Sequence, residues 1–218
     1  MASKLIVFDM DGVLVDPTRS YRQTVVETVA LLGGAISLAA IEDYKNQGGW
    51  NNDWALTQRI LADQSIVIAY ADVQREFTRL FAEHVMQEQW LVADGMLERL
   101  RGRYRLGIFT GRLQADAAHT LQRFASHIDF APQVCAEDVA CGKPAPDGLH
   151  KIQREHPGVD LVFLGDTIDD ARSARLAGVA FYGIAKRDHL RRTELLRLFK
   201  EEQAVEILEN VNEIEAHV

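Results

Sequence analysis

The second half of the chain alternates short apolar runs with amphipathic segments. The apolar runs occur at 103–111, 129–138, 159–167 and 178–185, and the segment 4–9 near the N-terminus has the same character. Segments with helical spacing separate them at 95–102, 114–126, 146–155 and 169–177. Near-continuous apolar runs that alternate with helices are typical of a parallel sheet covered by helices on both faces. We therefore predict strands at the five apolar runs and helices between them.

The pattern between residues 17 and 90 is helical and predicts no strand. Apolar residues three or four positions apart form one stripe through Tyr21, Val25, Val29 and Leu32, which ends at the helix stop Gly33-Gly34. A second stripe comprises Val73, Phe77, Leu80, Phe81 and Val85. Shorter helices are expected at 37–46 and 53–63.

These patterns predict the fold class and the domain organisation. The class is α/β, with a doubly wound, Rossmann-like parallel sheet as the core and an all-α helical cap inserted into it. The core comprises residues 1–16 and 92–218, and the cap comprises residues 17–91. The candidate hinges are Asp16-Pro17 and the segment 93–95, where the pattern changes.

Charge and hydropathy narrow the choice of partners. The net charge of -8 and a pI near 5.4 argue against nucleic acid and anionic membranes, because both require a basic surface. No apolar stretch approaches the roughly 20 residues of a membrane span, and the run at 4–9 is too short for a signal peptide. We therefore expect a cytoplasmic protein that binds small molecules.

Polar residues follow the predicted strands at the point where each strand ends. They are Asp9 and Asp11, then Thr110 and Gly111, then Asp166, Asp169 and Asp170, with Lys143 before a predicted helix. In an open parallel sheet, ligands bind beyond the carboxyl ends of the strands. We therefore expect these residues to gather at one edge of the sheet.

Asp9 and Asp11 are two positions apart, so their side chains can point to the same side of an extended segment. Two carboxylates at such a short separation repel each other unless a cation or a proton lies between them. Oxygen ligands from Asp9 and Asp166 suit Mg²⁺, which also shares phosphate oxygens with a substrate. The alternative is that these residues are solvated turn acids.

Thr110 and Lys143 complete a site for a phosphoryl group. Lys143 lies between Gly142 and Pro144 and supplies a positive point charge suited to a phosphoryl oxygen. Alone, Thr110 would be taken for a turn or cap residue, and Lys143 for a surface residue. Their occurrence together with the acidic strand ends favours the functional interpretation.

Four motifs in order resemble those of the haloacid dehalogenase-like hydrolases, specifically the phosphatase branch with phosphoglycolate phosphatases and β-phosphoglucomutases. They are "DMDGVLVD" (9–16), "FTGR" (109–112), "GKPAPDG" (142–148) and "GDTIDD" (165–170), and together they span nearly the whole chain. The resemblance implies a doubly wound core with a helical cap inserted after the first motif. The same layout follows independently from the periodicity.

The resemblance also implies a role for each motif residue. Asp9 is the nucleophile that forms an aspartyl-phosphate, and Asp11 is the general acid and base. Thr110, the main-chain N–H of Gly111 and Lys143 would neutralise charge on the transferring phosphoryl group.

Asp166, with Asp9 and the main-chain carbonyl of Asp11, would hold Mg²⁺. Asp170 would fix Lys143 or a metal-bound water, whereas Asp169 is interpreted as an acid in the first turn of a helix. Family members that break carbon–halogen or carbon–phosphorus bonds lack an acid at the position of Asp11. The resemblance therefore implies a phosphatase that acts on a small phosphorylated metabolite.

The cap contains one unusual segment, "NQGGWNNDW" at 46–54, in which two glycines permit a tight turn. Asn51, Asn52 and Asp53 are candidates to bind the leaving group. An equally weighted alternative is a helix N-cap at Asn52 or Asp53.

Three arginines are candidates to bind a second anionic group of the substrate: Arg19, Arg22 and Arg112. The alternative for each is an exposed side chain on a helix.

Two other functions remain open from the sequence. A phosphomutase would return the phosphoryl group from Asp9 to a bound sugar instead of to water, and the cap would decide between the two. A signalling receiver domain also combines acids, a Thr and a Lys on a doubly wound sheet. Receiver domains are shorter and have no helical insert after the first strand, which argues against this alternative.

Overall fold

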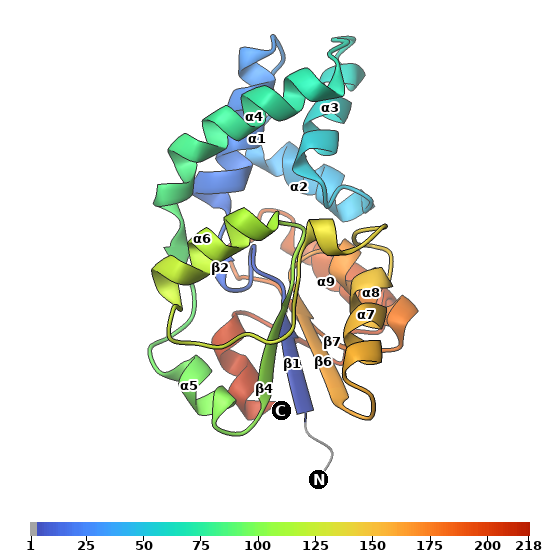
Figure 1. The fold of residues 1–218 in the computed structure, drawn as a ribbon. Coiled ribbons are helices and arrows are strands. Elements are labelled where there is room, and N and C mark those ends of the chain that lie inside the picture. Colours follow the sequence, from blue (N-terminus) through green and yellow to red (C-terminus); the bar gives the residue numbers. More distant parts are fainter. Residues whose placement is uncertain (1–3) are drawn as a thin grey trace.

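The computed structural model describes residues 4–218 (Figure 1). Its main sheet has six parallel strands in the order β5-β4-β1-β6-β7-β8. The strands are β1 (Lys4–Phe8), β4 (Arg105–Phe109), β5 (Gln133–Val134), β6 (Asp160–Gly165), β7 (Ala180–Ile184) and β8 (Glu206–Leu208). The predicted α/β class with a parallel, doubly wound sheet is therefore confirmed.

Helices cover both faces of this sheet because successive residues of the strands point to opposite sides. In β1, Ile6 and Phe8 join one hydrophobic cluster, whereas Leu5 and Val7 join another. The first cluster is covered by α5 (Met96–Arg101), α6 (Gln114–Phe124) and the 3₁₀ turn η4 (Val211–Ala216). The second is covered by α7 (Asp147–Glu155), α8 (Ile168–Ala177) and α9 (Arg192–Glu201). The continuous apolar runs thus correspond to strands buried on both faces.

The strand order reverses at β1. β4 lies on one side of β1 and β6 on the other, and the registers place Phe8 opposite both Ile108 and Leu164. The carboxyl ends of these three strands are therefore level. This is the switch point at which doubly wound sheets bind ligands.

A separate group of helices lies beyond that edge (Figure 1). It comprises α1 (Gln23–Leu31), α2 (Leu38–Gln47), α3 (Asp53–Asp63) and α4 (Tyr70–His84), with the π-helical turn η1 (Thr18–Arg22) before α1 and the 3₁₀ turn η2 (Val85–Gln87) after α4. These helices share their own hydrophobic cluster, which includes Val25, Ile41, Ile60 and Phe77. We call this group the cap helices.

Two short strands join the segments that enter and leave the cap helices. β2 (Val15–Asp16) pairs antiparallel with β3 (Gln89–Trp90). The prediction of no strand from 17 to 90 is therefore wrong at its last two residues, because β3 lacks the length to show a period. The pairing holds the two connecting segments side by side.

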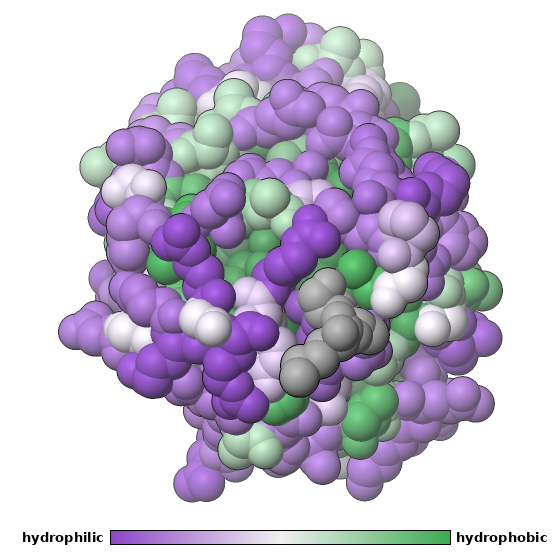
Figure 2. Space-filling view, turned by 60° about the horizontal axis from the view of Figure 1, so that its bottom comes forward, coloured by the Kyte–Doolittle hydropathy of each residue, from purple (hydrophilic) through white to green (hydrophobic). Residues whose placement is uncertain are grey.

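The structure adds elements after residue 185 that the sequence analysis did not predict. α9 fills a face of the sheet through Leu195, Leu198 and Phe199, and β8 forms the edge strand beside β7. The face at the amino ends of the strands is mostly hydrophilic (Figure 2). Within residues 4–218, no helix is long and apolar enough to cross a membrane.

Candidate active site

The ends of β1, β4 and β6 bring the acidic motif residues and Thr110 to one place. Asp9 follows β1 directly, Thr110 follows β4 and Asp166 follows β6. Lys143 lies in the loop before α7, and its Nζ is 3.0 Å from Asp9 Oδ1. All but Asp166 are buried, although each carries a polar group. The predicted gathering of these side chains at the carboxyl edge agrees with the geometry.

Lys143 is held by two carboxylates and two aromatic rings. Its Nζ donates to Asp170 Oδ1 at 2.6 Å and forms an ion pair with Asp9. It also lies 5.3 Å from the ring of Phe109 and 5.7 Å from that of Phe163. Burial disfavours the charged ammonium, but Asp170 and Asp9 outweigh burial and raise the pKa of Lys143. Lys143 is therefore a fixed positive charge beside Asp9.

Asp170 is held in place by the start of α8. The backbone N–H and the hydroxyl of Thr167 both donate to Asp170 Oδ2, at 3.0 Å and 2.6 Å. Asp170 N donates in return to Thr167 Oγ1, which makes a capping box. One carboxylate oxygen thus caps the helix and the other accepts from Lys143.

The carboxylates fit a divalent metal ion. One oxygen from each of Asp9, Asp166 and Asp170 lies within 4.8 Å of the others. Asp166 Oδ1 is buried and has no hydrogen-bond partner within residues 4–218. Burial raises the pKa of Asp9 to about 7 and that of Asp166 well above its usual value. A buried carboxylate oxygen without a partner costs free energy, and a cation would remove that cost.

A close approach of the main chain completes this cluster. Gly12 has a φ of +72°, and a Cβ added there would lie 1.8 Å from Asp166 Oδ2. Only glycine fits at this position. The backbone after Asp11 therefore passes directly over the Asp166 carboxylate.

Arg112 is buried and ion-paired on both sides. Its Nε and Nη2 donate to the two carboxylate oxygens of Asp11 at 2.9 Å and 2.7 Å. Nη2 also donates to Glu88 at 2.6 Å, and Nη1 donates to Thr120 at 2.7 Å. Burial would raise the pKa of Asp11, but the Arg112 guanidinium outweighs it and lowers the pKa. The guanidinium that was expected to meet a substrate anion is thus engaged with protein carboxylates.

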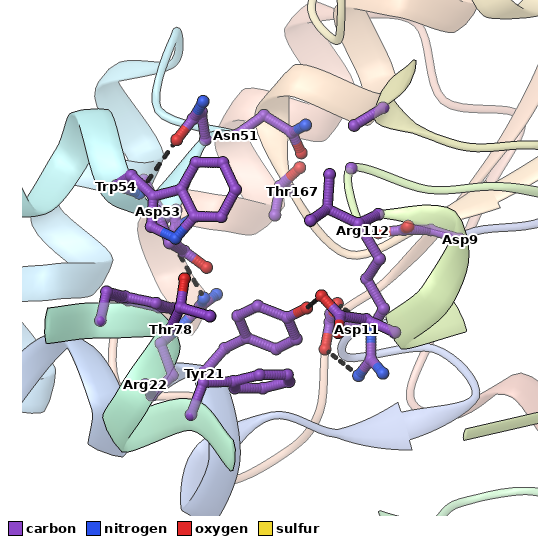
Figure 3. A pocket seen from close by; sticks show the side chains of 18 of the residues that line it. Asp9, Asp11, Tyr21, Arg22, Asn51, Asp53, Trp54, Thr78, Arg112 and Thr167 are labelled. Carbon is purple, nitrogen blue, oxygen red and sulfur yellow. Dashed lines mark hydrogen bonds and ion pairs between the residues drawn. The ribbon is translucent and has the colours of Figure 1, made fainter. Parts of the chain in front are cut away.

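A cavity of about 150 Å³ lies above the carboxyl edge. The core contributes Asp9, Asp11 and Arg112, and the cap helices contribute Tyr21 and Trp54, which project into the same space (Figure 3). Further residues that line it are Arg22, Lys45, Asn51, Asn52, Asp53, Phe77, Thr78, Phe81, Gly111, Leu113, Asp116, Ala136, Asp166 and Thr167. Side chains from both halves of the molecule therefore enclose one space.

The three candidate cap residues have different surroundings. Asn51 extends over the core, because a Cβ added to Gly111 would lie 2.4 Å from Asn51 Nδ2. Asn52 Oδ1 accepts from Trp54 N and Ala55 N, so Asn52 is the N-cap of α3. Asp53 accepts from Lys45 at 2.7 Å. Asn52 therefore caps a helix, which was the alternative to binding the leaving group.

Arg19 lies outside this cavity. Its side chain is exposed and lines a different hollow, together with Asp16, Thr18 and Gln87. Arg19 belongs to the π-helical turn η1, which directs it away from the carboxyl edge while Arg22, three positions on, is buried beside the cavity. The structure therefore places Arg19 outside the cavity that Asp9 and Asp11 line, away from the position expected of a substrate-binding residue.

The comparisons with known proteins agree with this geometry. The family model of haloacid dehalogenase-like hydrolases matches residues 3–178. The chain belongs to this family. The match includes all four motifs, and the predicted resemblance and the prediction of an enzyme are both confirmed.

Relatives of this haloacid dehalogenase-like hydrolase carry different names. A Phytophthora nicotianae protein named imidazoleglycerol-phosphate dehydratase is 30% identical over 195 residues, which cover 82% of this chain and 42% of that protein. The chain thus spans less than half of its length. A phosphoglycolate phosphatase from Pseudomonas syringae pv. syringae is 28% identical over 188 residues, which cover 81% of this chain and 67% of the relative.

A solved structure shows the same fold over the full length. It is a Lactobacillus plantarum protein described as a phosphoglycolate phosphatase, with a TM-score of 0.76 and 19% identity, and the match covers 100% of both chains. At this identity the likeness concerns the fold alone.

Several residues at the site of this hydrolase were not predicted. Asp169, expected to be only a first-turn acid, accepts from Gly49 N at 2.7 Å and so joins α8 to the glycine turn of the cap helices. No sequence pattern marks Glu88, because its role depends on a contact with Arg112, which is distant in the sequence. Tyr21, Lys45 and Asp116 resemble ordinary helix residues in sequence, and only the fold directs them to the cavity.

Proposed function

We propose that this hydrolase is a magnesium-dependent phosphatase that releases phosphate from a small phosphorylated metabolite through an aspartyl-phosphate on Asp9. The observation that carries the proposal is the Asp9 carboxylate at the floor of the cavity. It lies 3.0 Å from the Lys143 ammonium and beside Asp166, which has a buried oxygen without a hydrogen-bond partner in the described part of the chain. This arrangement suits in-line attack on a phosphoryl group whose charge is neutralised on several sides.

The reaction divides into two displacements. Asp9 attacks phosphorus and forms the acyl phosphate while the ester oxygen departs, and Asp11 donates a proton to that oxygen. Asp11 then accepts a proton from water, the resulting hydroxide attacks phosphorus, and phosphate leaves Asp9. Lys143, Thr110 and the N–H of Gly111 stabilise charge on the phosphoryl oxygens in both steps.

Asp9, Asp166 and the main-chain carbonyl of Asp11 would hold Mg²⁺. When bound, the ion would neutralise phosphoryl charge and the repulsion between the carboxylates. Asp170 positions Lys143 through their 2.6 Å hydrogen bond. Asp170 is therefore assigned a positioning role, whereas Lys143 contacts the phosphoryl group.

Arg112 donates to both oxygens of Asp11 and favours its ionised form, so a turn of Asp11 away from Arg112 would help it to act as acid and base. Arg112 keeps Glu88 as a partner when Asp11 turns, so its guanidinium does not remain unpaired. We assign Arg112 the role of holding Asp11 rather than of binding substrate.

The division into a core (1–16 and 92–218) and a cap (17–91) is part of the proposal. The cap helices would supply the contacts to the leaving group, through Asn51, Tyr21 and Trp54. The phosphoglycolate phosphatase name of one relative supports a small phosphate ester as the substrate class.

Phosphate release by purified protein tests the proposal. With Mg²⁺ and p-nitrophenyl phosphate we expect many turnovers per chain, whereas Asp9→Asn should lower kcat by at least about 10³-fold, the scale of losing a nucleophile. Asp129→Asn, an exposed acid outside the site, is the matched control.

Substantial turnover by folded Asp9→Asn protein would remove Asp9 from the nucleophile role. Full activity in excess chelator would contradict the magnesium assignment. A single phosphorylation per chain without turnover would instead indicate a receiver-like acceptor, and isomerised sugar phosphate in place of free phosphate would indicate a mutase.

A further inference from the structure

The basic side chains that line the cavity are already paired with carboxylates. Lys45 donates to Asp53 Oδ1 and to the carbonyl oxygen of Trp50, each at 2.7 Å. Arg22 donates to Glu42 at 2.9 Å, and its Nη1 lies 4.0 Å from Asp53. Arg112 is shared between Asp11 and Glu88, as described above. A substrate carboxylate would therefore have to break an existing buried ion pair to find a cation.

The acidic side chains outnumber the basic ones around this cavity. Among the described residues, five carboxylates line it, those of Asp9, Asp11, Asp53, Asp116 and Asp166, against the three basic side chains named above. A divalent ion at Asp9 and Asp166 would be matched by the two charges of a phosphate ester. Lys143, whose Nζ lies 3.0 Å from Asp9, adds a fourth positive charge at the floor of the cavity, so the excess of carboxylates is one. This excess disfavours a second anionic group on the substrate.

Asp116 differs from the other four carboxylates. It lies on α6, outside the reaction centre, and among the described residues it makes no ion pair within 4.0 Å. Its one side-chain hydrogen bond is a long one, 3.5 Å from Tyr21 Oη. Burial raises the pKa of the Asp116 carboxyl. Because its contact with Tyr21 is long and no described cation pairs with it, the Asp116 carboxylate can accept further hydrogen bonds from a charged donor in the cavity.

The wall beside Asp116 is aromatic. Tyr21, Trp54, Phe77 and Phe81 all line the cavity, and Tyr21 packs on Phe81 with ring centroids 4.2 Å apart. Figure 3 shows Tyr21 and Trp54 facing the space in front of Asp9 and Asp11. Aromatic rings attract organic cations and stack with other rings.

We propose that the cavity selects phosphate monoesters of amino alcohols, with the ammonium group of the substrate bound by Asp116 against the aromatic wall. This inference rests on the proposed phosphatase function and adds a substrate class to it. Phosphate esters that carry a carboxylate, such as phosphoglycolate, are poor substrates on this basis. Asp116 is a specificity residue and takes no part in the bond-breaking steps.

Phosphate release from four esters tests the inference with the full chain and Mg²⁺. The esters are 2-aminoethyl phosphate, histidinol phosphate (an amino alcohol that adds a ring), phosphoglycolate and p-nitrophenyl phosphate. The variant is Asp116→Asn, which keeps the shape of the side chain, and Asp129→Asn is the control. A charge-assisted hydrogen bond is worth about 10- to 100-fold in affinity.

We expect kcat/KM for both amino-alcohol esters to exceed that for phosphoglycolate by at least about tenfold. Asp116→Asn should lower kcat/KM for the amino-alcohol esters by about 10- to 100-fold, mainly through KM. The same variant should leave p-nitrophenyl phosphate turnover within about twofold, because that ester has no ammonium group.

Two results would overturn the inference: preferential turnover of phosphoglycolate, or an equal loss on all four esters in Asp116→Asn. In both cases the phosphatase function itself would stand. By contrast, failure of the wild-type chain to release phosphate from any ester, p-nitrophenyl phosphate included, would refute the proposed function and the inference with it.

Discussion

Replacing Arg112 with leucine should destabilise the protein strongly, because it leaves Glu88 buried without its cation. The Glu88 side chain has no exposed surface, and its remaining side-chain partner is the Thr120 hydroxyl at 2.7 Å. Removing one partner of a buried ion pair typically costs about 3–5 kcal/mol. Because the free energy of unfolding of small domains is about 5–15 kcal/mol, the Arg112→Leu protein should still fold but with a much lower stability.

The double variant Arg112→Leu/Glu88→Leu should recover most of the loss. Replacing both partners of a buried pair with apolar side chains is often close to neutral, because neither charge of the pair remains buried alone. Asp11 also loses Arg112, but its side chain is 23% exposed and can be solvated. We therefore expect a coupling energy of about 2–3 kcal/mol between the two positions, from a cycle of both single variants and the double variant.

Urea unfolding followed by circular dichroism measures these differences. Arg79→Leu is the control, because Arg79 makes only exposed pairs on α4 and should change the stability by about 0.5 kcal/mol or less. A cost of Arg112→Leu below about 1 kcal/mol, or no recovery of stability in the double variant, would refute the prediction that Glu88 depends on Arg112 as its buried partner.

Three further outcomes are expected. Burial raises the folded-state pKa of Asp9 from 3.8 to about 7, so the contribution of Asp9 to the unfolding free energy of the metal-free protein should fall as pH rises from about 4 to 7. Mg²⁺ should therefore raise Tm more at pH 8 than at pH 5.5, and equal shifts in calorimetry would contradict this. Gly165→Ala should lower the free energy of unfolding by about 1–3 kcal/mol and impair phosphate release, because the added Cβ would lie 2.3 Å from Asp170 Cβ. Gly142→Ala is the control: an added Cβ there would meet no described atom within 4 Å, so stability and phosphate release should stay unchanged. Asn52→Ala should cost about 1 kcal/mol in urea unfolding through loss of the α3 cap, and an unchanged midpoint would argue against that capping role.

The core of the fold and the residues at the strand ends could be predicted from the sequence. β1, β4, β6 and β7 are continuous apolar runs, and that pattern arises because helices cover both faces of the sheet. The polar residue that follows each run is then placed by topology alone. Asp9, Thr110 and Asp166 could therefore be brought together without any coordinates.

The end of the chain was not predicted, although part of its signal is present. Leu195, Leu198 and Phe199 have helical spacing, but charged residues dilute the pattern in α9. β8 has three residues, too few to display a period of two. Short edge elements of this kind are defined by their neighbours more than by their own residues.

The contacts of the arginines and of the cap helices could not be predicted for a different reason. Arg112 was correctly placed beside the site by its position after Thr110, but its partner Glu88 belongs to a connecting segment with no pattern of its own. The direction of Arg19 and Arg22 depends on the π-helical turn η1, which shifts the helical phase. Side-chain pairing across distant segments is therefore outside the reach of local patterns.

Asp9 and Asp11, two positions apart, have pKa values that are shifted in opposite directions. Burial raises the pKa of Asp9 despite Lys143, whereas Arg112 lowers the pKa of Asp11 despite burial. The proposed roles require the reverse order, with an ionised nucleophile at Asp9 and a proton on Asp11. A further cation beside Asp9 would favour its ionised form, and Asp11 would hold a proton more readily away from Arg112. We therefore expect metal binding and a turn of Asp11 away from Arg112 to favour the proposed chemistry.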